Sequence, residues 1–210
     1  MKPYYDDGQI TIYHGNCRDI LPTLNPVDLV LTDPPYGIGD KWTHSVMIGK
    51  NGASRLWGQG ETWDDEPADI VSLINLDCHI CIWGGNYFTL PPARQWLIWD
   101  KGQIFSGSDA ELAWTNWPGT VRIYRMTRID AFVNKATQRK THPTEKPLGL
   151  MRWCISLAPN QPQTILDPFM GSGTTLRAAK DLGRKAIGIE IEERYCEIAV
   201  KRLAQEVLAF

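Results

Sequence analysis

Short apolar runs alternate with segments of helical spacing along most of the chain. Runs of continuous apolar character predict strands buried on both faces, and they occupy 10–15, 28–33, 79–85, 95–101, 163–169 and 185–191. Helical spacing, with proline or glycine at several boundaries, predicts helices over 67–76, 147–158, 173–183 and 192–208, and one or two turns over 17–24. This alternation predicts an α/β fold with a mostly parallel sheet and helices on both faces.

Three segments depart from the alternation. Two runs, 109–116 and 121–128, are separated by a Trp-Pro-Gly turn and predict an antiparallel pair. Residues 37–62 contain six glycines without a regular period, and 129–141 are also irregular. Because long loops in compact domains are usually functional or disordered, we expect residues 37–62 to face a ligand. We expect the same of residues 118–146, because they are rich in Lys and Arg.

Composition narrows the class of protein. A chain of 210 residues with 43% hydrophobic residues fits one domain over 1–210. A net charge of −2 excludes a uniformly basic coat protein, so any anionic partner must meet a local patch. No apolar run approaches the ~20 residues of a membrane span, and the N-terminus lacks an apolar signal core, which predicts a cytoplasmic protein without membrane contact.

The cysteines predict neither disulfides nor a metal site. The chain has five, an odd number, and no secretion signal accompanies them. Cys78 and Cys81 match Cys-x-x-Cys, but they lie in an apolar run and have no second ligand pair. We therefore expect a buried strand at this position and no bound metal.

A glycine turn follows the predicted strand 163–169. Asp167 ends that strand, Gly171 and Gly173 precede a helix, and Glu190 ends the next strand 17 residues after Gly173. Glycines there let a backbone approach a ligand, and an acid ~20 residues further on can accept hydrogen bonds from a ribose. Neither the P-loop nor the complete dinucleotide fingerprint is present. On this turn alone, a ligand site and an ordinary strand-to-helix turn are equally supported.

Two further short motifs have simple structural explanations when taken alone. Asp33-Pro34-Pro35-Tyr36 ends the strand 28–33 and could be a proline-rich turn. "HPTEKP", residues 142–147, could be a loop with a solvated lysine, although Thr144 and Lys146 could also meet a small carboxylate.

Taken together and in this order, "DPPY", "HPTEKP" and "DPFMGSGTT" resemble the β-class amino methyltransferases of DNA. In that family the catalytic motif precedes the S-adenosylmethionine (SAM) loop. The resemblance extends over nearly the whole chain, from "IYHGNCRDIL" to "GIEIEERYCEIA". It implies a permuted Rossmann-like SAM methyltransferase sheet of seven strands, one of them antiparallel, with SAM at the carboxyl ends of the strands.

The resemblance also implies roles for individual residues. The loop 169–173 would hold the methionine end of SAM, with Asp167 near its amino group, and Glu190 would accept from the ribose. "GNC" would border the adenine of SAM, although the family commonly has Asp in place of Asn16. The residues implied for cofactor binding are Asn16, Cys17, Thr144, Lys146, Asp167, Phe169, Gly171, Gly173, Thr174 and Glu190.

The chemistry of an exocyclic amine explains the catalytic motif, Asp33, Pro34, Pro35 and Tyr36. The amine of adenine is a poor nucleophile because its lone pair is delocalised into the ring. The Asp33 carboxylate and the Pro34 carbonyl can accept from its two N–H groups and localise that pair. Tyr36 can stack on a base that has left the duplex. Within the family, Asp at the first position favours adenine N6, whereas Ser is commoner in cytosine-N4 enzymes.

DNA is the expected partner, and basic residues predict where it is contacted. Seven Lys or Arg against two acids lie between 118 and 146, which suits a phosphate-contacting edge, although a solvated face is nearly as well supported. The glycine-rich segment 37–62 supplies further cations. The residues predicted to contact nucleic acid are Lys41, Lys50, Arg55, Arg122, Arg125, Lys135, Arg139 and Lys140.

The sequence thus predicts a SAM-dependent adenine-N6 DNA methyltransferase of the restriction–modification type. A cytosine-N4 or RNA methyltransferase of the same fold is one alternative. A non-catalytic SAM-fold subunit that binds nucleic acid is another, which the intact motifs disfavour. Whether the protein is a homodimer, and whether a restriction enzyme accompanies it, stays open at this level.

Overall fold

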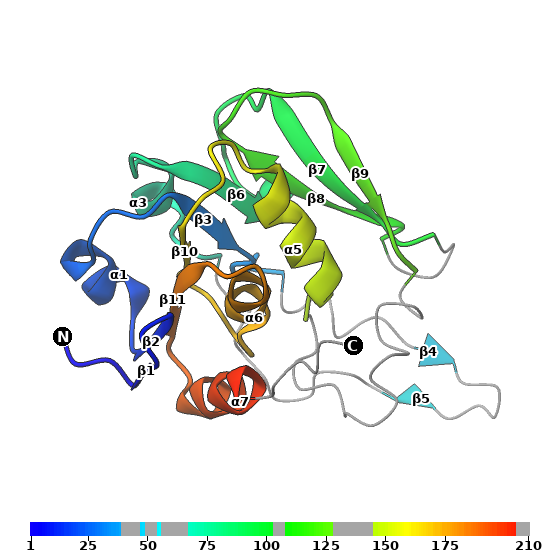
Figure 1. The fold of residues 1–210 in the computed structure, drawn as a ribbon. Helices are drawn as coiled ribbons and strands as arrows, with labels where there is room; N and C mark the ends of the chain where they lie inside the picture. Colours follow the sequence, from blue (N-terminus) through cyan, green and yellow to red (C-terminus); the bar gives the residue numbers. More distant parts are fainter. Residues whose placement is uncertain (39–46, 49–53, 56–66, 103–107, 128–144, 205–210) are drawn as a thin grey trace.

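The computed structural model describes residues 1–38, 47–48, 54–55, 67–102, 108–127 and 145–204, and its core is a nine-stranded sheet. The strands of this sheet follow the order β1-β2-β11-β10-β3-β6-β8-β7-β9 (Figure 1). Their bounds are β1 Tyr5–Asp6, β2 Ile10–His14, β3 Leu29–Thr32, β6 His79–Trp83, β7 Gln95–Asp100, β8 Ala110–Thr115, β9 Arg122–Arg125, β10 Thr164–Asp167 and β11 Lys185–Glu190. A separate antiparallel pair joins β4 (Met47–Ile48) and β5 (Ser54–Arg55).

The predicted sheet type is confirmed. Neighbouring strands from β2 through β11, β10 and β3 to β6 are all parallel. Strand β8 runs antiparallel between β6 and β7, and β9 is parallel to β7. The short edge strand β1, which pairs antiparallel with β2, and β9 extend the seven strands expected from the resemblance to nine.

The predicted antiparallel pair of 109–116 with 121–128 is wrong. Strand β8 pairs with β6 and β7, and β9 lies on the far side of β7, where Leu97 is opposite Arg122. The link between β8 and β9 therefore crosses the start of β7, where the Gln95 side chain donates to the Thr120 carbonyl at 2.9 Å. A Cβ on Gly119 would stand 2.7 Å from the Gln95 side chain, so glycine lets the link pass over this strand.

The described helices are shorter than the ranges predicted from helical spacing. They are α1 Cys17–Ile20, α3 Val71–Ile74, α5 Leu148–Leu157, α6 Thr174–Asp181 and α7 Glu193–Leu203, with 3-10 turns η1 Leu21–Thr23 and η2 Gly85–Tyr87. The predicted helix 67–76 begins late because Pro67 forms a bridge with Tyr36 and the Ala68 N–H donates to the Pro35 carbonyl. Among the described residues, no helix is long and apolar enough to cross a membrane.

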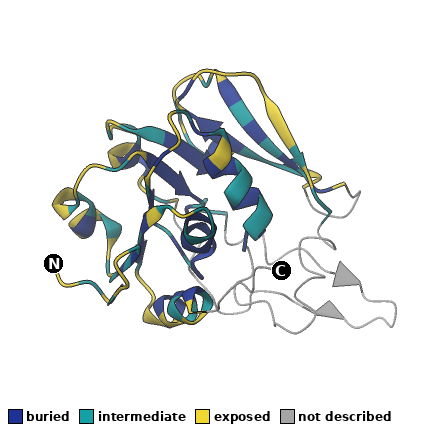
Figure 2. Cartoon of the chain, in the orientation of Figure 1, coloured by how far each residue is buried: buried dark blue, intermediate teal, exposed yellow. Residues whose placement is uncertain are grey.

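Both faces of the sheet are covered, which accounts for the continuous apolar runs. In β3, Leu29 and Leu31 belong to the apolar cluster shared with α5, α6 and α7. Val30, between them, belongs to the second cluster, which packs against α1, η1 and α3. The central strands and α6 are the most deeply buried parts of the fold (Figure 2).

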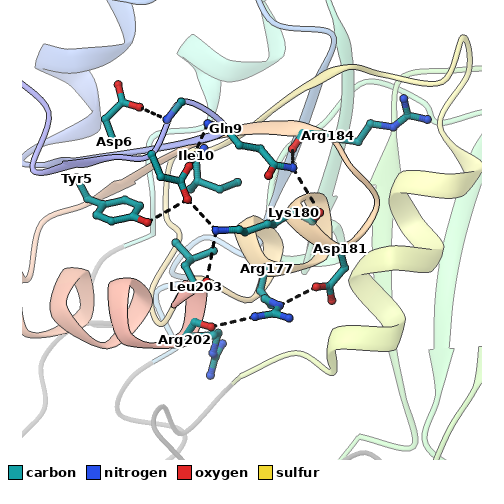
Figure 3. A network of polar contacts seen from close by, with 12 residues as sticks. Tyr5, Asp6, Gln9, Ile10, Arg177, Lys180, Asp181, Arg184, Arg202 and Leu203 are labelled. Carbon is teal, nitrogen blue, oxygen red and sulfur yellow. Dashed lines mark hydrogen bonds and ion pairs between the residues drawn. The ribbon is translucent and has the colours of Figure 1, made fainter. Parts of the chain in front are cut away.

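A polar network anchors α6 to the edge of the sheet and to α7 (Figure 3). The Lys180 ammonium donates to Asp7 at 2.7 Å, and the same carboxylate accepts from the Ile10 N–H at 2.7 Å. The Arg177 guanidinium donates to Asp181 at 2.7 Å and to the Arg202 carbonyl at 3.1 Å. These contacts fix the helix that follows the glycine turn.

Candidate active site

A cavity of about 270 Å³ lies at the carboxyl ends of β3, β10 and β11. Parallel strands bring their carboxyl ends to one edge, which is where open α/β sheets bind ligands. The cavity wall contains five acids and one lysine among apolar and neutral polar residues. It is made by Gly15, Asn16, Cys17, Asp33, Pro35, Glu145, Lys146, Met151, Asp167, Pro168, Phe169, Met170, Gly171, Ser172, Thr174, Thr175, Ile189, Glu190, Ile191, Glu192 and Tyr195.

Glu190, at the end of β11, holds the glycine turn. Its two carboxylate oxygens accept from the Gly171 and Glu192 N–H groups, each at 2.9 Å. Gly171 has φ +50°, a conformation that favours glycine. A carboxylate offers about four lone-pair sites, so Glu190 can still accept from a ligand hydroxyl. Burial raises the pKa of Glu190, against the lowering effect of these backbone donors.

Asp167, at the end of β10, is buried at the base of the cavity. Its Oδ1 accepts from the Thr32 hydroxyl at 2.8 Å and from the Phe169 N–H at 3.2 Å. Burial raises the pKa of Asp167 to about 6, although the Thr175 and Thr32 hydroxyls oppose the shift. Within the described part of the chain, neither Asp167 nor Glu190 forms an ion pair with Lys or Arg.

Gly173 is needed for packing on α7, a reason that the sequence did not give. Its φ is +78°, and a Cβ there would stand 2.7 Å from the Ala199 Cβ. Gly173 is absent from the cavity wall, unlike Phe169, Gly171 and Thr174. The Thr174 hydroxyl accepts from Arg202 at 2.6 Å and so also fastens the turn to α7.

Asn16 and Cys17 line the cavity, as the resemblance implies for the adenine of SAM. The Asn16 side-chain oxygen accepts from the Arg18 N–H at 3.0 Å and caps α1. The side-chain amide of Asn16 therefore has a local structural role in addition to its place in the wall.

Asp33 lies just after β3, on the same cavity, and both of its oxygens have donors. The Tyr36 hydroxyl donates to Oδ1, and the Lys146 ammonium donates to Oδ2 at 2.6 Å. The resemblance placed Lys146 near the SAM carboxylate. Lys146 does line the cavity, but its ammonium contacts Asp33, the predicted catalytic aspartate, and its role toward SAM stays a prediction.

Tyr36 sits in an aromatic group formed with η2. Its ring stacks on Tyr87 with centroids 4.9 Å apart and an interplanar angle of 16°, and Phe88 meets it edge-on. Gly84, with φ +68°, has no room for a Cβ because the Tyr36 ring occupies that space. Burial raises the pKa of Tyr36 well above its usual value, so the hydroxyl keeps the proton that it donates to Asp33.

Sequence reasoning missed Glu111 and Lys101. Glu111, on β8, accepts from Lys146 at 3.0 Å and from Lys101 at 2.7 Å. The sequence offered two signals. One was an acid inside the apolar strand 109–116, and the other was a lysine at the end of the preceding strand, "QWLIWDK". Nothing in the sequence indicated that β8 lies beside β6 and so brings this acid near Asp33.

The predicted nucleic-acid residues are only partly described. Arg122 and Arg125 are exposed on the edge strand β9, and Arg125 pairs with Asp100 at 3.3 Å. Arg55 lies in β5, of which only the backbone is described. The remaining predicted contacts fall outside the described residues; they are Lys41, Lys50, Lys135, Arg139 and Lys140. Thr144, predicted to bind the cofactor, also lies outside them.

Comparison with solved structures agrees with this architecture. The chain matches the crystal structure of an M1.HpyAVI–SAM complex with a TM-score of 0.57 and 24% identity, over 92% of this chain and 99% of that one. It also matches the PvuII DNA methyltransferase, described as cytosine-N4-specific, with a TM-score of 0.62 and 17% identity, over 99% and 91% of the two chains.

Sequence comparison gives the family. The chain is 45% identical to the type II methyltransferase M.HinfI of Haemophilus influenzae, over 98% of this chain and 71% of that protein. It is 29% identical to M2.MboI of Moraxella bovis, over 96% and 91%. Residues 82–201, more than half of the chain, match the N6_N4_Mtase family, described as DNA methylase. With the motifs and the sheet order, these matches establish that the chain belongs to the N6/N4 family of DNA methylases.

Proposed function

We propose that this DNA methyltransferase transfers the methyl group of SAM to N6 of adenine in DNA. The observation that carries the proposal is that Asp33 lines the same cavity as Asp167, Gly171 and Glu190. A residue suited to accept from an amine therefore faces the residues suited to hold the methyl donor. Such proximity can supply much of the lowering of a reaction barrier.

The charge of the cavity supports SAM as the cofactor. SAM carries a positive sulfonium and a positive amino group, and it supplies an activated methyl group when bound. Asp167 and Glu190 are acids without a Lys or Arg partner within the described residues. Burying such acids is costly unless a cation approaches them. The resemblance assigns Asp167 to the amino group and Glu190 to the ribose hydroxyls, and the free lone pairs of Glu190 suit that contact.

The Asp33 end of the cavity suits a neutral amine. Tyr36 and Lys146 fix the plane of the Asp33 carboxylate, and each oxygen retains a lone pair for an N–H of the substrate. The carbonyl of Pro34, in the rigid backbone before Pro35, supplies the second acceptor. With both N–H groups engaged, the lone pair of the amine is directed at the methyl carbon. Direct attack requires no covalent intermediate with the protein.

The identity of the base rests on Asp33, because Asp at this position favours adenine within the family. Cytosine N4 is the second candidate. The observation in its favour is the fold likeness to the PvuII enzyme, which is described as cytosine-N4-specific. Either amine is inaccessible inside a duplex, so the base must leave the stack. Tyr87, which is 49% exposed and stacked on Tyr36, adds an aromatic surface for that base.

The test is methylation of unmodified genomic DNA by the purified protein with labelled SAM. Digestion to nucleosides and mass spectrometry should show N6-methyldeoxyadenosine. N4-methyldeoxycytidine in its place would contradict the choice of base but retain the reaction. A parallel reaction with RNA should yield no product. An Asp33→Ala protein, assayed in the same way, controls for contaminating methyltransferases.

A further inference from the structure

Four charges of alternating sign lead away from the catalytic aspartate. The Lys146 ammonium lies 2.6 Å from Asp33 and 3.0 Å from Glu111, and the Lys101 ammonium lies 2.7 Å from Glu111. The four residues come from different places in the sequence: the end of β3, the residues before α5, strand β8 and the end of β7. Only the tertiary structure brings them into one row.

Both lysines of this row are buried. Their side chains are 5% exposed for Lys146 and 9% for Lys101, so each ammonium depends on its acidic partners. Burial acts to lower the pKa of Lys146, but Asp33 and Glu111 raise it well above its usual value. Burial acts to raise the pKa of Glu111, but Lys146 and Lys101 lower it to about 2. Lys146 and Glu111 are therefore charged at neutral pH, and the row contains two lysines and two acids.

We propose that Glu111 is a positioning residue for methyl transfer, which shares the Lys146 ammonium with Asp33 and so leaves the Asp33 carboxylate free to accept from the target amine. This inference rests on the proposed function, because it assigns Asp33 to that amine. Lys101 keeps Glu111 in place from the other side. Glu111 acts through Lys146 and does not itself touch the substrate.

The geometry explains why Glu111 matters. An ammonium has three donors, and those of Lys146 are divided between two carboxylates on different strands. If Glu111 lost its charge, Asp33 would be the remaining strong acceptor for Lys146 within this row. The ammonium already lies 2.6 Å from Oδ2, and the donor released by Glu111 would then turn toward the remaining Asp33 lone pairs that the amine needs. A displacement of ~1 Å at a reacting group can cost up to ~10²-fold in rate.

The experiment compares Glu111→Gln with wild type in single-turnover methyl transfer, at saturating SAM and unmethylated genomic DNA. We expect the rate to fall by about 10–100-fold, while the SAM dissociation constant, from calorimetry, stays within about 3-fold. Because Glu111→Gln leaves Lys101 buried without its acid, the double variant Lys101→Met/Glu111→Gln is measured as well. The double variant removes one lysine and one acid, so the row again contains equal numbers of lysines and acids.

The double variant separates positioning from stability. If Glu111 positions Lys146, the double variant regains thermal stability but its transfer rate stays as low as that of Glu111→Gln. Recovery of the wild-type rate in the double variant, or an unchanged rate in folded Glu111→Gln, would overturn the inference. Glu197→Gln, which removes the acid of an exposed Glu–Lys pair on α7, is the matched control and should transfer at the wild-type rate. An inactive wild type would instead overturn the proposed function.

Discussion

The two ends of the cavity hold their carboxylates in opposite ways. At one end, Asp33 has a lysine 2.6 Å away, and that lysine is shared with a second acid. At the other end, Asp167 and Glu190 are held by hydroxyls and backbone N–H groups, with no Lys or Arg pair among the residues that the structure describes. Both arrangements satisfy the oxygens with donors, but only the first neutralises the charge.

This difference matches the charges of the two proposed ligands. A neutral amine can approach Asp33 because Lys146 already balances the charge of the carboxylate, and Lys146 and Tyr36 fix the orientation of the carboxylate. A cationic cofactor can approach Asp167 and Glu190 because it provides a positive charge near these acids, which no described Lys or Arg does. Changes at the Asp33 end should therefore alter the rate of transfer, and changes at the other end should alter the binding of SAM.

The largest expected effect is that of Asp33→Ala on the transfer rate. Losing one preorganised group at a reacting centre typically costs ~10²–10³-fold, and we expect at least this loss. The SAM dissociation constant should stay within a few-fold, because Asp33 is proposed to contact the amine and not the cofactor. Single-turnover rates and calorimetry measure the two quantities. Loss of SAM binding in a folded Asp33→Ala protein would contradict the division of the cavity, and exposed Asp77→Ala serves as control.

Glu190→Gln should show the converse pattern. A glutamine cannot accept with both side-chain heteroatoms, so it loses either the Gly171 or the Glu192 N–H, as well as the negative charge. We expect SAM affinity to fall by about 10–100-fold, because a hydrogen bond to a charged group contributes ~1.5–3 kcal/mol. The rate at saturating SAM should change much less. Glu193→Gln, exposed on α7, should bind SAM normally, and an equal effect of the two variants would disprove a specific role for Glu190.

The binding of SAM should depend on pH through Asp167. Its pKa is about 6 in the free protein, and a bound cation favours the ionised carboxylate. Binding therefore releases a proton below pH 6. SAM affinity should fall by up to ~10-fold for each pH unit below 6 and level off above it. Calorimetry across this range measures the effect, and Asp167→Asn should reduce the slope. A flat profile in wild type would place the amino group of SAM elsewhere.

The smallest expected effect concerns the edge strand β9, outside the cavity. If the exposed Arg122 contacts a phosphate, Arg122→Gln should lower the slope of log affinity against log salt by ~0.9 on duplex DNA. Binding should weaken alike on all sequences, because phosphate contacts carry no base information. SAM affinity should not change. Lys185→Gln, an exposed cation at the start of β11, is the control, and an unchanged slope for Arg122→Gln would mean that Arg122 is solvated.

The sequence by itself determined the order of strands and helices and the two motifs that meet at the cavity. Continuous apolar runs such as 28–33 and 163–169 predicted strands covered on both faces, and β3 and β10 lie there. Asp33, Asp167, Gly171 and Glu190 were predicted as site residues because their motifs, taken together, resemble those of a known family. Motifs of this kind are local, so their chemistry can be inferred without knowing how distant segments pack.

The tertiary structure alone decided what depends on contacts between distant segments. The turn at 117–119 suggested that β8 and β9 pair, but the Gln95 contact carries the chain across β7. The need for Gly173 comes from Ala199 on α7, which no local pattern specifies. The row from Asp33 to Lys101 requires that β8 insert beside β6, and the energy that favours paired buried charges acts only after the strands are placed. A single sequence records the residues of such a row but not their distances.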